Sequence, residues 1–255
     1  MRDEEKPEDL VSSLIPHPSS LLRILLWDID GTLIRSARRD AFKDYTAPVL
    51  EGVFGTAGRL MEMTVSGMTD LQIIAEALRD EGFTREQIRE RLDELKESYM
   101  REMERVTRND KEFFYLLPGA REVLEETARD PRYHNALLTG NIEPAAYLKM
   151  LLVGLSEFFD LPGAFGDESH DRRDLPALAA GRINARLNLD LDPSQFIVIG
   201  DTPNDISCAR HFGAKAVAVA TGRMYPAADL LPYKPDALLP DLSDVGLVMQ
   251  TLDAL

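Results

Sequence analysis

Two acidic residues, Asp28 and Asp30, follow an apolar segment that is typical of a buried strand, in the pattern Asp28-Ile29-Asp30-Gly31-Thr32. If the chain turns at Gly31, both carboxylates can converge on one site at the tip of that strand. Carboxylates gathered in this way repel one another unless a cation lies between them, and their oxygens suit Mg²⁺. Such an ion would let an anionic carboxylate approach an anionic phosphoryl group. The alternative is a solvated acidic loop. This interpretation is weaker, because the two aspartates follow an apolar strand and lead into a Gly-Thr pair.

Three further loops carry polar groups next to short apolar or helical segments. Thr139 ends one apolar segment, two arginines precede a helical segment, and Asp201 and Asp205 follow another apolar segment. The three loops read Leu137-Leu138-Thr139-Gly140-Asn141, Asp171-Arg172-Arg173-Asp174-Leu175-Pro176 and Gly200-Asp201-Thr202-Pro203-Asn204-Asp205. Their side chains are the types that bind phosphoryl oxygens or metal ions.

Short apolar segments alternate with amphipathic segments after residue 20. The predicted strands are 22–29, 134–139, 196–200 and 214–220. The predicted helices of this part are 119–129, 143–152, 175–187, 204–212 and 243–252. This alternation predicts right-handed crossovers and a doubly wound, Rossmann-like α/β fold with a parallel sheet. Because such sheets bind ligands at the carboxyl ends of their strands, we expect the site among loops 28–32, 139–141, 166–174 and 200–205.

A helical insertion interrupts this alternation at 37–115. Within it, 84–108 carries one apolar stripe and is predicted to form a single helix, with Thr84 as N-cap and Gln87 completing a capping box. Segments 37–53 and 70–80 are also predicted to be helical. The expected organisation is a tail at 1–20, a core at 21–36 and 116–255, and a small α-helical cap at 37–115.

The composition excludes several classes of protein. A net charge of −15 argues against nucleic acid, which is bound by clustered Lys and Arg, so an anion site here must be local. No apolar run is long enough to span a bilayer, so no membrane partner is expected. The only cysteine, Cys208, and the charged start of the chain favour a cytoplasmic protein without a secretory signal.

The four loops, in order, resemble the four motifs of the haloacid dehalogenase-like hydrolase superfamily. The resemblance covers nearly all of 22–255, and the helical insertion is similar to the cap that follows the first motif in phosphoglycolate phosphatase-like members. It implies that Asp28 is the nucleophile, forming an aspartyl-phosphate, and that Asp30 is the general acid and base. Thr139 and the Gly140 amide would hold phosphoryl oxygens.

The resemblance also implies a basic residue that balances the phosphate charge. By register this residue is Arg172, with Arg173 as the less favoured candidate. The alternative for one of these arginines is a surface ion pair with Asp171 or Asp174, and this alternative is favoured for Arg173. Mg²⁺ would be held by the side chains of Asp28 and Asp201 and by the backbone carbonyl of Asp30. Asp205 would be a further ligand or a residue that orients the site. Alternatively, Asp205 is a carboxylate at the start of a helix, where the helix dipole favours a negative charge. Asn141, Thr202 and Asn204 are expected only to cap or turn their loops.

Within the superfamily, Asp30 favours phosphate esters, because a dehalogenase needs no acid to protonate a leaving oxygen. The segment 66–70 resembles the cap loop that reaches the substrate, which makes Gly67 and Thr69 candidate specificity residues; alternatively, Thr69 only caps the following helix. Among other residues, the arginines that could meet a substrate carboxylate or form a solvated face are Arg35, Arg38, Arg39 and Arg59.

The predicted function is a magnesium-dependent phosphatase acting on a small phosphorylated metabolite, with phosphoglycolate-like specificity as one option. A phosphosugar mutase with the same nucleophile is the alternative enzyme. A catalytically idle binding protein on the same fold is the alternative of another class. The substrate itself and the oligomeric state are not determined by these motifs.

Overall fold

The computed structural model describes residues 22–255, apart from the side chain of Asn109. The predicted N-terminal tail lies outside the described residues. At the centre is a five-stranded, all-parallel sheet with the order β4-β1-β5-β6-β7. Its strands are β1 (Arg23–Trp27), β4 (Tyr133–Leu137), β5 (Phe196–Gly200), β6 (Lys215–Val219) and β7 (Ala237–Leu239). The four predicted strands are therefore confirmed, and β7 was not predicted.

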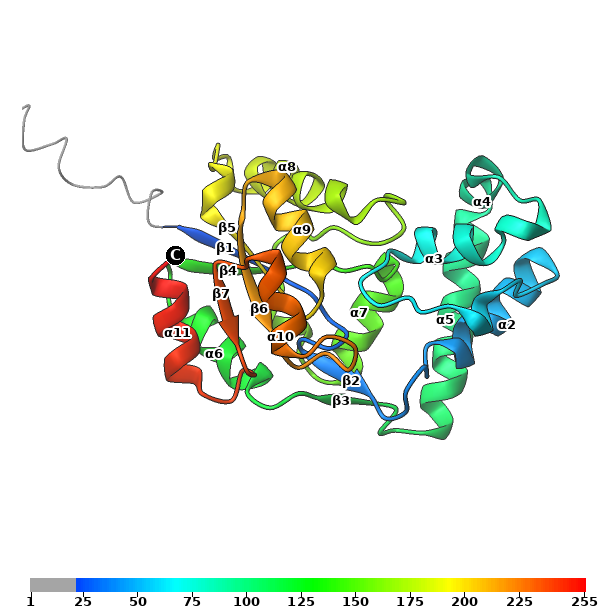
Figure 1. The fold of residues 1–255 in the computed structure, drawn as a ribbon, viewed down its shortest axis with the longest axis horizontal. Helices are drawn as coiled ribbons and strands as arrows, with labels where there is room; N and C mark the ends of the chain where they lie inside the picture. The colour runs from blue at the N-terminus through cyan, green and yellow to red at the C-terminus, as the bar shows by residue number, and fades with distance from the viewer. Residues whose placement is uncertain (1–21) are drawn as a thin grey trace, which may run out of the picture.

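Helices cover both faces of this sheet (Figure 1). Alternate residues of β1 divide between two buried clusters, with Leu25 and Trp27 in one and Ile24 and Leu26 in the other. The first face is covered by α6 (Ala120–Arg129), α7 (Glu143–Leu152) and α11 (Val245–Asp253), and the second by α8 (Leu175–Leu187), α9 (Pro203–Phe212) and α10 (Ala227–Leu230). This arrangement confirms the predicted doubly wound α/β fold.

The strand order brings the predicted loops together. β1 lies between β4 and β5. The strand that follows in this sheet, β4, pairs with one edge of β1, and the next strand, β5, pairs with its opposite edge. This reversal makes the carboxyl end of β1 the switch point at which such folds bind ligands. Asp28 follows β1, Thr139 lies just beyond β4, and Asp201 follows β5. Parallel pairing therefore places these three residues at one edge.

The helical insertion leaves and rejoins the core through an antiparallel pair, β2 (Ile34–Ser36) and β3 (Phe114–Leu116). Its helices lie to the right of the sheet in Figure 1. They are α2 (Lys43–Phe54), α3 (Asp70–Ala77), α4 (Arg85–Glu90) and α5 (Leu92–Asn109). Short 3₁₀ helices complete the structure at Leu60–Glu62, Arg79–Glu81, Ser156–Phe158, Arg172–Asp174, Pro193–Gln195 and Leu231–Tyr233.

The prediction of one helix over 84–108 is wrong in one respect. The capping box of Thr84 and Gln87 is confirmed, but the chain leaves helical geometry at Arg91 and restarts as α5. The break lets the two helices cover different partners, because α4 packs on α3 whereas α5 packs on α2 and α7. The helix predicted over 37–53 begins only at Lys43.

A contact between α2 and α5 compensates for a proline. Pro48 lies inside α2 and has no N–H to donate to the carbonyl oxygen of Asp44, one turn earlier. The guanidinium of Arg105, on α5, donates to that oxygen at 2.9 Å. The two helices are therefore joined by a polar contact as well as by apolar packing, which supports the frame of the insertion. Among residues 22–255, no helix is long and apolar enough to cross a membrane.

Candidate active site

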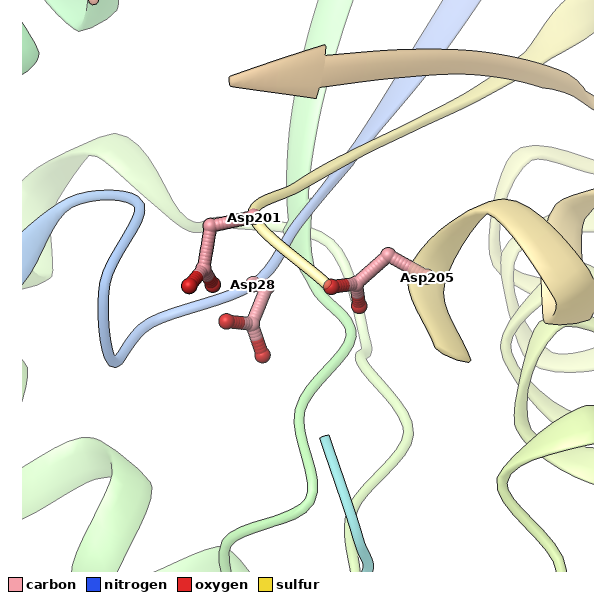
Figure 2. A group of neighbouring side chains, drawn as sticks. All are labelled: Asp28, Asp201 and Asp205. Carbon is pink, nitrogen blue, oxygen red and sulfur yellow. The ribbon is translucent and has the colours of Figure 1, made fainter. Parts of the chain in front are cut away.

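Three aspartates, two at strand ends and one at the start of a helix, form a buried acidic cluster (Figure 2). Asp28 follows β1, where its amide donates to the carbonyl oxygen of Ile199 at 2.9 Å. Asp201 follows β5, and Asp205 lies in the first turn of α9. One carboxylate oxygen from each of the three lies within 4.8 Å of the others, and all three residues are buried. The sequence prediction that these acids converge is in agreement with this geometry.

The electrostatics of the cluster fit a hard divalent cation. Burial raises the pKa of Asp28 to about 7, with the charge of Arg172 opposing the rise and that of Asp205 adding to it. Burial and the charge of Asp28 also raise the pKa of Asp201 well above its usual range. Glycine at position 31 keeps the Asp201 carboxylate accessible, because a Cβ there would lie less than 3.0 Å from it. Buried, crowded oxygen ligands of this kind suit Mg²⁺.

One buried arginine joins two of these acids. Arg172 begins a 3₁₀ helix, and its guanidinium donates to Asp28 Oδ1 at 2.7 Å and to Asp205 Oδ1. The other oxygen of Asp205 accepts from the amide and the hydroxyl of Thr202, at 2.9 and 2.6 Å. Both oxygens of Asp205 are thus engaged, one by Arg172 and the other by Thr202. Arg173, in contrast, is exposed and pairs with Asp171.

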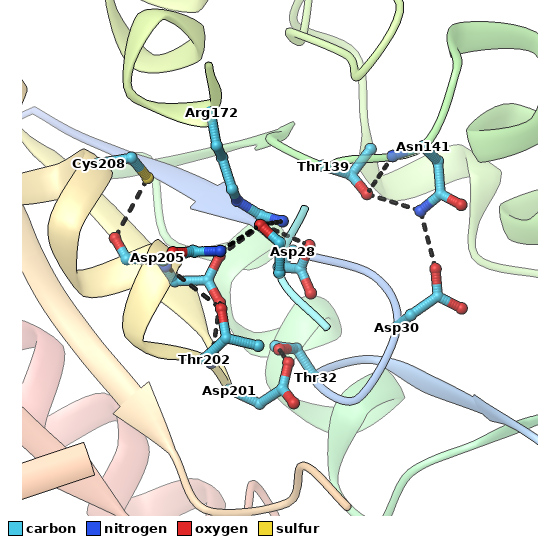
Figure 3. A network of polar contacts seen from close by, with 12 residues as sticks. Asp28, Asp30, Thr32, Thr139, Asn141, Arg172, Asp201, Thr202, Asp205 and Cys208 are labelled. Atoms are coloured by element: carbon cyan, nitrogen blue, oxygen red, sulfur yellow. Dashed lines mark hydrogen bonds and ion pairs between the residues drawn. The ribbon is translucent and has the colours of Figure 1, made fainter. Parts of the chain in front are cut away.

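Asp30 lies on the other side of Asp28, away from Asp205 (Figure 3). Its Oδ2 accepts from Asn141 Nδ2 at 2.8 Å and from Lys149 Nζ at 2.6 Å. Lys149 lies on α7 and is only 1% exposed. We did not predict Lys149 as a site residue, and we expected Asn141 only to turn its loop. The signal that could have identified Lys149 is its place on the apolar face of α7, beside the buried Ala145.

The loop 66–70 of the insertion lies against the strand ends. The amide of Asp70 donates to the carbonyl oxygen of Gly140 at 2.7 Å. The carbonyl oxygen of Gly67 accepts from Asn204 Nδ2 at 2.8 Å and from Arg172 Nη1 at 3.4 Å. Gly67 has φ +75°, and a Cβ there would come within 3.0 Å of the Thr202 hydroxyl, so only glycine permits this approach.

Thr69 has a structural contact rather than a place on the cavity wall. It is fully buried, and its hydroxyl accepts from the amide of Gln72 at 3.2 Å, which caps α3. The capping alternative for Thr69 is therefore confirmed. Thr139 is also buried, and its hydroxyl accepts from Asn141 Nδ2 at 2.7 Å.

A cavity of about 450 Å³ lies between the strand ends and the insertion. The core contributes the nucleophile candidate Asp28 and its neighbours, and the insertion contributes the far wall. Its lining includes Asp28, Asp30, Thr139, Gly140, Arg172 and Asp201 from the core, and Arg39, Lys43, Met63, Ser66, Gly67 and Met68 from the insertion. The volume suits a small molecule.

A doubly wound sheet with an acidic cluster at its switch point, facing a cavity under a helical insertion, is the arrangement of an α/β enzyme with its site at the strand ends. Comparison with known families agrees, because the haloacid dehalogenase-like hydrolase family matches residues 25–210 and a related HAD-hydrolase-like family matches 177–245. The chain belongs to the haloacid dehalogenase-like hydrolase family. The predicted family is thereby confirmed, and with it the prediction of a hydrolase.

Individual proteins show the same relationship. The pyrophosphatase PpaX of Bacillus velezensis is 27% identical over 124 residues, 49% of this chain and 55% of that protein. The chain thus matches little more than half of that relative. A predicted phosphoglycolate phosphatase from Haemophilus somnus is 20% identical, with a TM-score of 0.59 over 90% of this chain and 99% of that chain. CbbY from Rhodobacter sphaeroides, in complex with phosphate, is 17% identical, with a TM-score of 0.59 over 88% and 96%. At such identities the two structures show a shared fold.

Proposed function

We propose that this protein is a magnesium-dependent phosphatase that hydrolyses a small phosphomonoester through an aspartyl-phosphate on Asp28. The observation that carries the proposal is the contact of Arg172 with Asp28 inside a buried acidic cluster that opens on the cavity. An arginine beside a carboxylate nucleophile provides the positive charge that a transferring phosphoryl group needs. The relatives named as phosphatases and a pyrophosphatase support the same class of reaction.

The two aspartates of the first loop have separate roles in this proposal. A carboxylate oxygen of Asp28 attacks phosphorus, the bond from phosphorus to the ester oxygen breaks, and Asp30 gives its proton to that oxygen. Asp30, now a carboxylate, takes a proton from water, and the resulting hydroxide attacks phosphorus. The bond between Asp28 and phosphorus then breaks, which releases inorganic phosphate and restores both residues.

The side chains of Thr139 and Arg172 and the amide of Gly140 orient the phosphoryl oxygens. Mg²⁺ would be held by the carboxylates of Asp28 and Asp201 and the backbone carbonyl of Asp30, with Asp205 at the edge of the cluster. When bound, the ion neutralises charge between the nucleophile and the phosphoryl group. Asp205 acts mainly by fixing Arg172, because both of its oxygens are already engaged.

We further propose that residues 37–115 form a cap over the site of a core made of residues 21–36 and 116–255. The hydrogen bonds that join the core to the backbone of the insertion, where the Asp70 amide donates to Gly140 and the Gly67 carbonyl oxygen accepts from Asn204, support this role, as does the contribution of the insertion to the cavity wall. A cap excludes water and restricts the substrate to a small metabolite. Arg35 and Arg39 line the cavity and could contact a second anionic group, whereas Arg38 pairs with Asp44. A cytoplasmic setting belongs to the same proposal.

The test is a panel of phosphorylated metabolites with Mg²⁺ or EDTA, in which released inorganic phosphate is measured. We expect metal-dependent turnover that Asp28→Asn reduces by more than about a thousandfold, because that variant has no nucleophile. Transfer of phosphate between sugar positions without release would instead identify a mutase. Binding of a phosphorylated ligand without turnover, unchanged in Asp28→Asn, would identify an idle binding protein and refute the proposal.

A further inference from the structure

The side chain of Lys149 has an unusual setting for a lysine. It projects from the face of α7 that also buries Ala145, Ala146 and Met150, and the residue is 1% exposed. Removing an ammonium group from water is costly unless the group is paired and hydrogen-bonded. A lysine at such a position therefore needs specific partners, and their identity indicates its role.

Its partners are two residues of the active site. Lys149 Nζ donates to Asp30 Oδ2 at 2.6 Å and to Asn141 Oδ1 at 2.6 Å, and it lies 5.3 Å from the centre of the Phe114 ring. Asn141 in turn donates to the same Oδ2 of Asp30 at 2.8 Å. The lysine and the asparagine thus contact each other and one oxygen of Asp30.

This arrangement leaves the two oxygens of Asp30 in different situations. Oδ2 is held by two donors, whereas Oδ1 accepts no hydrogen bond from any residue within 22–255. Asn141 also donates to the Thr139 hydroxyl at 2.7 Å, so the orientation of Asp30 is tied to the loop that would hold the phosphoryl oxygens. A carboxyl group anchored through one oxygen can present the other at a fixed angle.

We propose that Lys149, acting with Asn141, is a positioning residue that holds Asp30 by Oδ2 so that Oδ1 exchanges the proton with the leaving oxygen and with water. This inference rests on the proposed function, since it names the residue that positions Asp30, the proposed general acid and base. A proton transfer is efficient only when donor and acceptor lie within hydrogen-bond reach in the transition state. Rotation of an unanchored Asp30 side chain would lose that geometry without disturbing Asp28.

A competing role for Lys149 is direct binding of the substrate, since it also borders the cavity. The two roles differ in how they depend on the leaving group. Loss of a binding contact lowers kcat/KM equally for all phosphate esters of similar size. Loss of proton donation lowers it most for esters whose leaving oxygen is strongly basic, because an activated aryloxide leaves without a proton.

The experiment measures kcat/KM for wild type and Lys149→Met on a series from 2,4-dinitrophenyl phosphate to phenyl phosphate. Met replaces the lysine with an uncharged chain of similar length that a buried site accepts. We expect a loss of about 100-fold for phenyl phosphate and little loss for the dinitrophenyl ester, the range of general acid catalysis. KM should remain close to wild type. Lys149→Gln, whose amide can still donate a hydrogen bond, should lose less activity on phenyl phosphate than Lys149→Met.

Two comparisons make the outcome specific. Asp30→Asn should show the same dependence of kcat/KM on the leaving group. Adding Lys149→Met to Asp30→Asn should lower kcat/KM little further, because both substitutions remove the same function, proton donation by Asp30. Lys215→Met is the matched control, since Lys215 starts β6 and pairs with Asp236 at 3.8 Å, and it should behave as wild type. If Lys149→Met lowers kcat/KM equally for all esters, or if its kcat/KM depends on the leaving group as in wild type, the positioning role is overturned. Wild-type protein without any phosphatase activity would overturn the proposed function as well.

Discussion

Arg172→Met tests whether the charge of Arg172 stabilises the buried acidic cluster of Asp28, Asp201 and Asp205. The Arg172 side chain is 6% exposed, and its guanidinium contacts Asp28 and Asp205, whose side chains are 7% and 2% exposed. Without it, two buried carboxylates lose their cation, and breaking such a pair costs about 4 kcal/mol. For a protein of this size that corresponds to a fall of roughly 10 °C in the midpoint of thermal unfolding. The measurement is urea and thermal unfolding in EDTA.

The loss of stability in Arg172→Met should be larger at high pH than at low pH. Burial raises the pKa of Asp28 to about 7 in the folded protein, against an ordinary value of 3.8, and the charge of Arg172 limits that rise. The folded state therefore binds more protons than the unfolded state between these values, and stability falls as the pH rises through 7. In Arg172→Met the pKa of Asp28 rises further. The loss should thus be larger at pH 8 than at pH 5, where a proton neutralises Asp28.

The neighbouring arginine supplies the control. Arg173 is 55% exposed and pairs with Asp171 at the surface, so Arg173→Met should change stability by less than about 0.5 kcal/mol. Equal stability of Arg172→Met and wild type at pH 8, or a loss that is the same at both pH values, would refute this account of the cluster.

Two further predictions concern the metal and the cap. Saturating Mg²⁺ at about 100 times its Kd should stabilise wild type by about 2.7 kcal/mol, and Asp201→Asn should abolish most of this gain; an equal shift in both proteins would place the ion elsewhere. Thr69→Ala should cost at least about 1 kcal/mol through the lost helix cap while KM stays unchanged, whereas Thr69→Ser, which keeps the capping hydroxyl and loses only a buried methyl group, should be more stable than Thr69→Ala. A raised KM in Thr69→Ala would instead indicate contact with the substrate.

Much of this protein could be predicted from the order of its residues. The strands are short apolar segments, and the parallel topology follows from their alternation with helices, so the convergence of Asp28, Thr139 and Asp201 at one edge was predictable. These features depend on local pattern and on the direction of the chain. Side-chain orientation is not needed to derive them.

Only the tertiary structure decided how the polar side chains of the site are oriented and paired. The register of the family motif favoured Arg172 over Arg173, but only the fold shows that Arg172 is buried against Asp28 while Arg173 faces solvent with Asp171. Lys149 is remote from Asp30 in the chain, and their contact depends on how α7 packs beside the sheet. The direction of a loop side chain and the partner of a buried charge are set by long-range packing, which a linear pattern does not contain.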